Sequence, residues 1–156
     1  MKRVYLETTI PSYLAAWPSR DLLQAARQQI THHWWTNERK QFDLCISQIV
    51  LDEVSDGDAR ASNDRLQILQ DLPLLGLTEE VNDLAQAIMD SGLLPQKATR
   101  DAVHIAIAAV HHVDILLTWN CRHIANAAIM KELDEVVAQS GYELPILCTP
   151  EELMGD

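Results

Sequence analysis

Residues 114–120, which read Asp-Ile-Leu-Leu-Thr-Trp-Asn, decide the fold class of this chain. The apolar run 115–117 stands between polar residues, which is typical of a strand buried on both faces of a parallel sheet. Parallel strands are joined through long crossovers, usually helices. We therefore predict an α/β fold in which this strand lies inside the sheet and Asn120 follows directly past its carboxyl end.

The segments around this strand alternate between β-favouring runs and helical spacing. Short runs that favour strands lie at 4–6, 44–46, 72–77 and 145–147. Helical patterns occupy 21–38, the residues after Ser47 through Val54, 58–70, 78–89, 101–112 and 124–140. This alternation predicts right-handed crossovers and a three-layer α/β/α sandwich with a mainly parallel central sheet. Ser47 and Thr99 are the expected N-caps of the helices that carry Glu53 and Asp101.

Length, composition and charge limit the class of protein. The 156 residues predict a single domain, 1–156, with 47% hydrophobic and 22% charged residues as in ordinary globular proteins. The net charge of −11 argues against a broad basic face that binds nucleic acid. Any polyanion must therefore bind at a local site. No apolar run approaches the ~20 residues of a membrane span. Three cysteines without a Cys-x-x-Cys pair favour a reducing cytoplasm.

Polar residues stand where strands end or helices begin. Glu7 follows the first strand, Glu53 lies one to two turns into the helix after the second strand, and Asn120 follows the 114–118 strand. Ligands of parallel sheets gather beyond the carboxyl ends of the strands, so we expect these side chains at one edge. Asp101 lies in the first turn of its helix and reaches the same edge only if that helix begins there.

Four stretches, in this order, resemble the motifs of PIN-domain ribonucleases: 5–14 (YLETTIPSYL), 47–53 (SQIVLDE), 100–108 (RDAVHIAIA) and 114–120 (DILLTWN). The resemblance is strongest to the VapC-type toxins of bacterial toxin–antitoxin pairs, and it covers nearly the whole chain. It implies a compact α/β/α sandwich in which acidic residues bind Mg²⁺ or Mn²⁺ and RNA is cut. It also implies a homodimer and a cognate antitoxin that occludes the site.

The resemblance assigns residues position by position. Glu7, Glu53 and Asp101 match the acidic metal-binding positions, and Asn120 matches a further catalytic position that is usually acidic. Glu7 stands where Asp is commoner, and its extra methylene moves the carboxylate outward by ~1.5 Å. Asn120 offers a neutral carbonyl oxygen, which leaves three carboxylates instead of four.

The chemistry of such a site follows from its charges. Carboxylates placed together repel phosphate, so the site suits RNA only with a divalent ion that inverts the local charge. Mg²⁺ prefers oxygen ligands and keeps several waters, and a water acidified by the ion can attack phosphorus in line. Thr8, Thr9 and Thr118 are expected to orient that water or a carboxylate by hydrogen bonding.

Each acidic residue also has a purely structural interpretation. The helix dipole favours an Asp such as Asp101 in a first turn by ~0.3–1 kcal/mol. Asn120 after a strand is equally an N-cap, and Glu53 in the acid-rich segment 52–58 is equally part of a solvated face. The joint placement of these residues with Glu7 favours the metal-site interpretation.

The histidines are further candidates, either as metal ligands or as partners of the acidic residues. His104 is expected to pack in its helix or to support Asp101, three residues away. A zinc site is disfavoured because residue 108 is Ala, which removes the usual i, i+4 histidine pair, and His123 has no evident partner.

The residues beside the site are candidates for RNA contact. Trp119 either stacks an RNA base, worth ~1–3 kcal/mol in single-strand binders, or packs in the protein. Arg100 and Arg122 flank Asp101 and Asn120 and either bind phosphate or are ordinary surface charges.

The site residues and the resemblance together favour a metal-dependent endoribonuclease, and the resemblance implies that it is the toxin of a toxin–antitoxin pair. The alternative is a catalytically weak or inactive PIN-like module that acts through RNA or protein binding, because Asn120 is not acidic. Phosphotransferases with an aspartyl nucleophile are excluded because positions 7 and 9 are Glu and Thr instead of the Asp pair that this chemistry uses.

Overall fold

The computed structural model describes residues 1–155 and arranges them around one central sheet. Its strands are β1 (Lys2–Leu6), β2 (Phe42–Ser47), β3 (Leu74–Leu75), β4 (Ile115–Leu117) and β5 (Ile146–Cys148). Within the described residues the strand order is β3-β2-β1-β4-β5, and every neighbouring pair is parallel. The predicted parallel sheet is therefore confirmed, with the 114–118 strand inside it.

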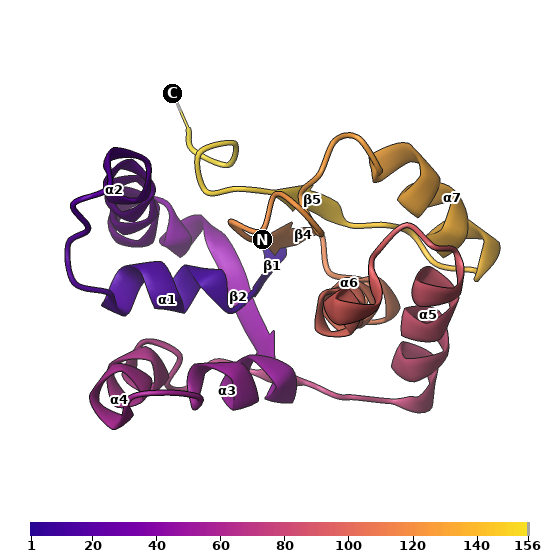
Figure 1. The fold of residues 1–156 in the computed structure, drawn as a ribbon, viewed down its shortest axis with the longest axis horizontal. Coiled ribbons are helices and arrows are strands. Elements are labelled where there is room, and N and C mark those ends of the chain that lie inside the picture. The colour runs from indigo at the N-terminus through magenta and orange to yellow at the C-terminus, as the bar shows by residue number, and fades with distance from the viewer. Residues whose placement is uncertain (156) are drawn as a thin grey trace.

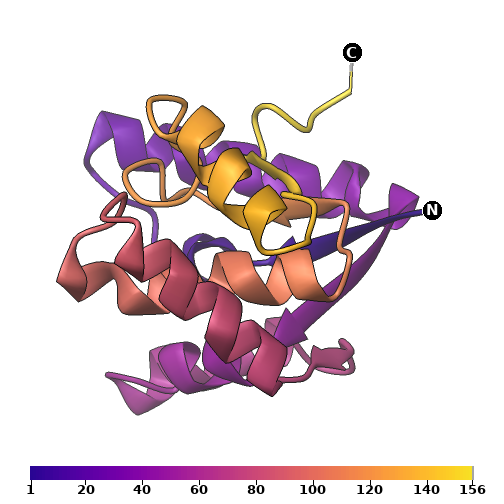
Figure 2. The ribbon, with the colours of Figure 1, turned by 90° about the vertical axis from the view of Figure 1, so that its right-hand side faces the viewer.

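The helices form a layer on each face of the sheet. Those of the first half are α1 (Thr9–Ala15), α2 (Leu22–Asn37), α3 (Gln48–Val54) and α4 (Ala59–Ile68). Those of the second half are α5 (Glu79–Asp90), α6 (Thr99–Val110) and α7 (Met130–Gln139), and short 3₁₀ turns lie at Arg39–Gln41 and Gln96–Ala98. Figure 1 shows α1 and α2 on one side of the sheet and α5, α6 and α7 on the other. Figure 2 looks onto the second layer. The three-layer sandwich is confirmed.

The core lies where β1, β4 and α6 meet. The apolar residues of β4 are all buried, as are Val4, Tyr5 and Leu6 of β1. Helix α6 is buried on nearly every side between 102 and 109, and its alanines allow neighbouring elements to approach closely. A helix that is apolar all round belongs in the interior, so the composition of this segment already indicates its central place.

Two helix starts differ most from the sequence prediction. The final helix begins at Met130 instead of 124, because residues 120–129 form turns in which Asn120 O accepts the Ile124 and Ala125 N–H groups. Local hydrogen bonds of this kind compete with helix formation despite apolar spacing. Thr99 is the first residue of α6, and its hydroxyl donates to Gln96 O instead of capping the helix.

The apolar stripe of α2 is narrower than its sequence suggests. Its buried residues are Gln28, Thr31 and Trp34, whereas Leu22 and Leu23 are 87% and 60% exposed. The buried face is centred on Thr31, with Gln28 and Trp34 about 60° to either side; Leu22 lies about 180° and Leu23 about 80° from Thr31 around the helix axis, which places both outside that face. No helix within residues 1–155 is long and apolar enough to cross a bilayer.

Candidate active site

The carboxyl edge of the sheet brings the ends of β1 and β4 together. Leu6 pairs with Leu117, so Glu7 and Thr118, the next residues, lie side by side. The Glu7 N–H donates to Leu117 O at 3.1 Å. Helix α3 begins directly after β2 at this same edge, which positions Glu53.

Glu7 is a buried carboxylate held by three donors. Its side chain is almost inaccessible, and Oε1 accepts from Thr9 N at 3.1 Å, Thr9 Oγ1 at 2.5 Å and Thr118 Oγ1 at 2.7 Å. Burying a carboxylate is costly unless hydrogen bonds compensate, and these three do so on one oxygen. Among residues 1–155, Oε2 has no hydrogen-bond partner. One oxygen of Glu7 is therefore fixed by the protein, and the other makes no protein hydrogen bond within the described residues.

Glu53 shows the same division between its two oxygens. Oε1 accepts from Thr8 Oγ1 at 2.7 Å and from His104 Nε2 at 2.6 Å. Burial raises the pKa of Glu53, but the hydrogen bond and charge of His104, the Thr8 hydroxyl and the charge of Arg100 together outweigh it, so the net pKa is lowered. Glu53 is therefore ionised at neutral pH. Because Thr8 and Thr9 are consecutive, neighbouring residues hold Glu53 and Glu7.

The other acids near Glu53 point to solvent. Asp52 accepts from Gln48 Nε2, Asp56 lies 3.8 Å from Arg100, and Asp58 caps α4. These three residues are exposed, whereas the Glu53 side chain is 20% exposed and directed at Thr8 and His104. The solvated-face interpretation describes its neighbours but not Glu53.

His104 supports a different acid from the one predicted. It was expected to support Asp101, but its Nε2 contacts Glu53 and its Nδ1 contacts the Tyr5 hydroxyl at 2.7 Å. The physical reason is depth: Asp101 lies in the first turn of α6, while His104 is fully buried against β1 and α3. A spacing of three on a helix places residues near one another but does not select their partners.

The partner of Asp101 is His123, which the sequence did not indicate. His123 Nδ1 lies 3.0 Å from Asp101 Oδ2, and both side chains are 18% exposed. His123 is placed by Asn120, whose Oδ1 accepts the His123 N–H at 2.9 Å. A histidine three residues after an Asn at a strand end was the available signal, because an Asn side chain commonly accepts an N–H three residues on.

Asn120 forms a cap and also connects the acids. Its own N–H donates to Thr118 Oγ1 at 2.8 Å, and Thr118 in turn donates to Glu7. A continuous line of hydrogen bonds thus runs from Glu7 through Thr118, Asn120 and His123 to Asp101. Three of the four predicted catalytic residues, Glu7, Asn120 and Asp101, are thus connected at one edge, while Glu53 is held separately by Thr8 and His104. The capping interpretation of Asn120 describes what its oxygen does.

Trp119 packs inside the protein. Its side chain is 7% exposed, its indole N–H donates to Thr31 Oγ1 at 2.7 Å, and its ring meets Tyr13 edge-on. The Arg27 guanidinium lies over the same ring, 5.2 Å from its centroid. A ring covered in this way does not offer an open face to an RNA base, so the structure favours the packing interpretation.

The two arginines are exposed at the surface. Arg100 makes a loose pair with Asp56 at 3.8 Å, with both side chains mostly solvated. Arg122 is exposed in the turn after Asn120. Exposed ion pairs stabilise little, so both guanidinium groups are free to meet a phosphate.

The oxygen donors of this edge fit a hard divalent ion. In residues 1–155 no three His, Cys, Asp or Glu side chains are gathered as a ready metal cage. Mg²⁺, however, usually takes one or two carboxylates and completes its octahedron with waters and substrate phosphate. Glu7, Glu53 and Asp101 each have one oxygen held by the protein, which orients a carboxylate ligand. The donor set therefore suits Mg²⁺ or Mn²⁺.

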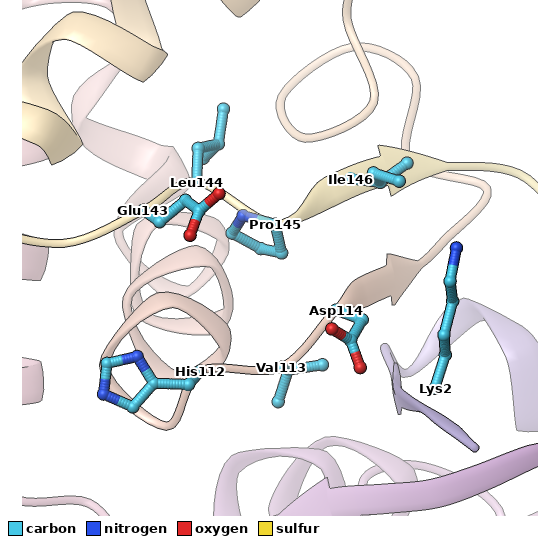
Figure 3. A pocket seen from close by; sticks show the side chains of 8 residues that line it. All are labelled: Lys2, His112, Val113, Asp114, Glu143, Leu144, Pro145 and Ile146. Atoms are coloured by element: carbon cyan, nitrogen blue, oxygen red, sulfur yellow. The ribbon is translucent and has the colours of Figure 1, made fainter.

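A separate cavity lies at the opposite edge of the sheet. Figure 3 shows its lining, a space of about 250 Å³ bordered by Lys2, 112–114 and 143–146. The Asp114 carboxylate there accepts the Arg3 N–H and stabilises the strand pair. Because ligands of parallel sheets bind at the carboxyl ends, this amino-end cavity is not the candidate site.

The fold and this edge together define a parallel α/β protein with an acidic site beyond its central strands. Residues 4–129 match the family model of the PIN domain. The chain therefore belongs to the PIN domain family, whose members are nucleases.

One solved structure shares the fold. It is the crystal structure of VapBC2 from Rickettsia felis bound to a DNA fragment from their promoter. The identity is 18%, the match covers 94% of this chain and 98% of that one, and the TM-score is 0.54. No curated protein matches this sequence.

Proposed function

We propose that this chain is a divalent-metal-dependent endoribonuclease that hydrolyses RNA phosphodiester bonds, and that it is the toxin of a toxin–antitoxin pair. One observation carries the proposal. Glu7, Glu53 and Asp101 each have one oxygen anchored by protein donors and a second oxygen without a partner among residues 1–155. In a chain of the PIN domain family, carboxylates oriented in this way at the carboxyl edge are suited to hold a catalytic cation.

Each site residue has a separate role in the proposed reaction. Glu7, Glu53 and Asp101 would hold Mg²⁺ or Mn²⁺, which when bound supplies Lewis acidity at the scissile phosphate. Thr9 and Thr118 fix Glu7. The net charge of −11 makes the cation necessary for a polyanion to approach, because three bare carboxylates would repel it.

The partners follow from the same proposal. RNA is the substrate, and Arg100 and Arg122 are the phosphate contacts because they are exposed beside Asp101 and Asn120. A cognate antitoxin and a homodimer belong to the proposed toxin. The similarity to a VapBC2 assembly supports the antitoxin partner.

The first test is cleavage of a mixed panel of labelled RNAs by the purified protein. We expect cutting in Mg²⁺ or Mn²⁺, none in EDTA, and recovery when excess Mn²⁺ is added back. Cutting that EDTA does not affect would contradict the metal-dependent mechanism. Binding of Mn²⁺ by calorimetry without cleavage of any RNA would favour the alternative, an inactive PIN-like module that acts by binding RNA or protein.

Asn120→Asp is expected to tighten Mn²⁺ binding and to keep or raise the cleavage rate. The carboxylate can still accept the His123 N–H that Asn120 Oδ1 accepts now, so the turn stays formed. The added charge lies within the line of contacts between Glu7 and Asp101. Calorimetry and initial rates at saturating Mg²⁺ check this. A clear loss of rate at saturating Mg²⁺ would show that the site is tuned to the amide.

A further inference from the structure

A line of polar groups crosses the core and ends on Glu53. Ser47 Oγ and the Tyr5 hydroxyl are 2.7 Å apart, the Tyr5 hydroxyl and His104 Nδ1 are 2.7 Å apart, and His104 Nε2 lies 2.6 Å from Glu53 Oε1. Ser47, Tyr5 and His104 are each 0% exposed. They come from β2, β1 and α6, so three elements are tied to one carboxylate. Buried polar groups at such a depth stabilise a fold only when every member is satisfied.

The direction of the hydrogen bond to Glu53 is settled by its acceptor. An ionised carboxylate only accepts, so His104 Nε2 carries the hydrogen. Burial raises the pKa of Tyr5 well above its usual value, so the phenol keeps its proton. A neutral imidazole then accepts the Tyr5 O–H at Nδ1, and a protonated imidazole donates to the Tyr5 oxygen. In both states Nε2 donates to Glu53.

We propose that His104, held in place by Tyr5, is a positioning residue that fixes Oε1 of Glu53 and leaves Oε2 as the oxygen available to the cation. This inference rests on the metal site of the proposed function. Glu53 lies near the end of the seven-residue helix α3, and a glutamate there has three side-chain torsions to restrain. Two donors on one oxygen, His104 Nε2 and Thr8 Oγ1, restrain them. Partners of this kind tune metal affinity although they do not touch the metal.

Two substitutions of similar polarity separate positioning from packing. In His104→Gln the side-chain amide reaches about as far as Nε2 and can still donate to Glu53. In His104→Asn the amide reaches only about as far as Nδ1, toward Tyr5. Both variants bury an amide at the same place, so a merely structural role predicts similar losses for both.

The test measures Mn²⁺ affinity by calorimetry without RNA, together with the thermal unfolding midpoint of each variant. We expect His104→Asn to weaken Mn²⁺ binding by about 10–100-fold and His104→Gln to weaken it much less. Cleavage is expected to follow the same order. Unchanged Mn²⁺ affinity in folded His104→Asn would overturn the inference, and so would equal losses in the two variants.

A third variant and the wild-type control keep the outcomes distinct. If neither His104 variant folds, Tyr5→Phe decides, because it removes only the hydroxyl that holds Nδ1: weaker Mn²⁺ binding supports the inference and unchanged binding overturns it. If the wild-type protein binds no Mn²⁺, the proposed function fails and this inference fails with it. If the wild type binds and cleaves while the Asn and Gln variants behave alike, only the role of His104 is wrong.

Discussion

Asp101→Asn is expected to abolish RNA cleavage, lowering kcat/KM by at least about 100-fold, the scale on which losing one charge-stabilising group acts. The amide oxygen of Asn can still accept a hydrogen bond from the ring nitrogen His123 Nδ1, which now lies 3.0 Å from Oδ2. What disappears is the negative charge on the oxygen that the protein leaves unpaired. The folding cost is small, because the charge in a first helical turn contributes only about 0.3–1 kcal/mol.

The measurement compares initial rates of wild type and variant purified side by side, with circular dichroism to verify the fold. Asp83→Asn is the matched control, because it removes the same charge from an exposed position on α5, away from the site. We expect Asp83→Asn to cut RNA at the wild-type rate. Normal turnover by folded Asp101→Asn would mean that Asp101 serves only the helix dipole.

Much of the fold could be predicted because burial leaves a simple pattern. The apolar run 115–117 marks a strand covered on both faces, and the alanine-rich segment 101–112 marks a helix covered on nearly all sides. Parallel strands then place their carboxyl ends together, which brings Glu7 beside Thr118. Predictions of this kind succeed because they depend on periodicity and topology alone.

The hydrogen-bond partners within the site could not be predicted in the same way. Glu53 and His104 are 51 residues apart, and Asp101 and His123 are 22 apart. Their pairing depends on side-chain depth and rotamer. The spacing of three residues between Asp101 and His104 was therefore a misleading guide to the partner of each side chain. Ser47 shows the same limit: it occupies the predicted N-cap position of α3, but its hydroxyl bonds Tyr5 instead of capping the helix.

Trp119→Ala is expected to lower the free energy of unfolding by about 3–5 kcal/mol, the usual cost of truncating a buried aromatic side chain to alanine. The ring fills space against Tyr13, and the loss also leaves the Thr31 hydroxyl without the indole N–H it now accepts. Trp119→Phe keeps much of the apolar contact, loses that hydrogen bond and removes only part of the ring volume, so its cost is expected to be smaller, about 1–3 kcal/mol. Urea unfolding followed by circular dichroism measures both losses.

Trp17→Ala provides the comparison that separates packing from RNA contact. Trp17 is 77% exposed, and an Arg60 guanidinium lies 5.4 Å from its ring centroid, an exposed contact worth about 0.5–1 kcal/mol. If Trp119 packs the core, Trp119→Ala loses far more stability than Trp17→Ala, and RNA binding by the molecules that remain folded is unchanged. A stable Trp119→Ala protein with weakened RNA binding would restore the stacking role. The burial of Trp119, which is 7% exposed and has the Arg27 guanidinium over its ring, argues for the first result, because a ring this deeply buried does not present an open face to a base.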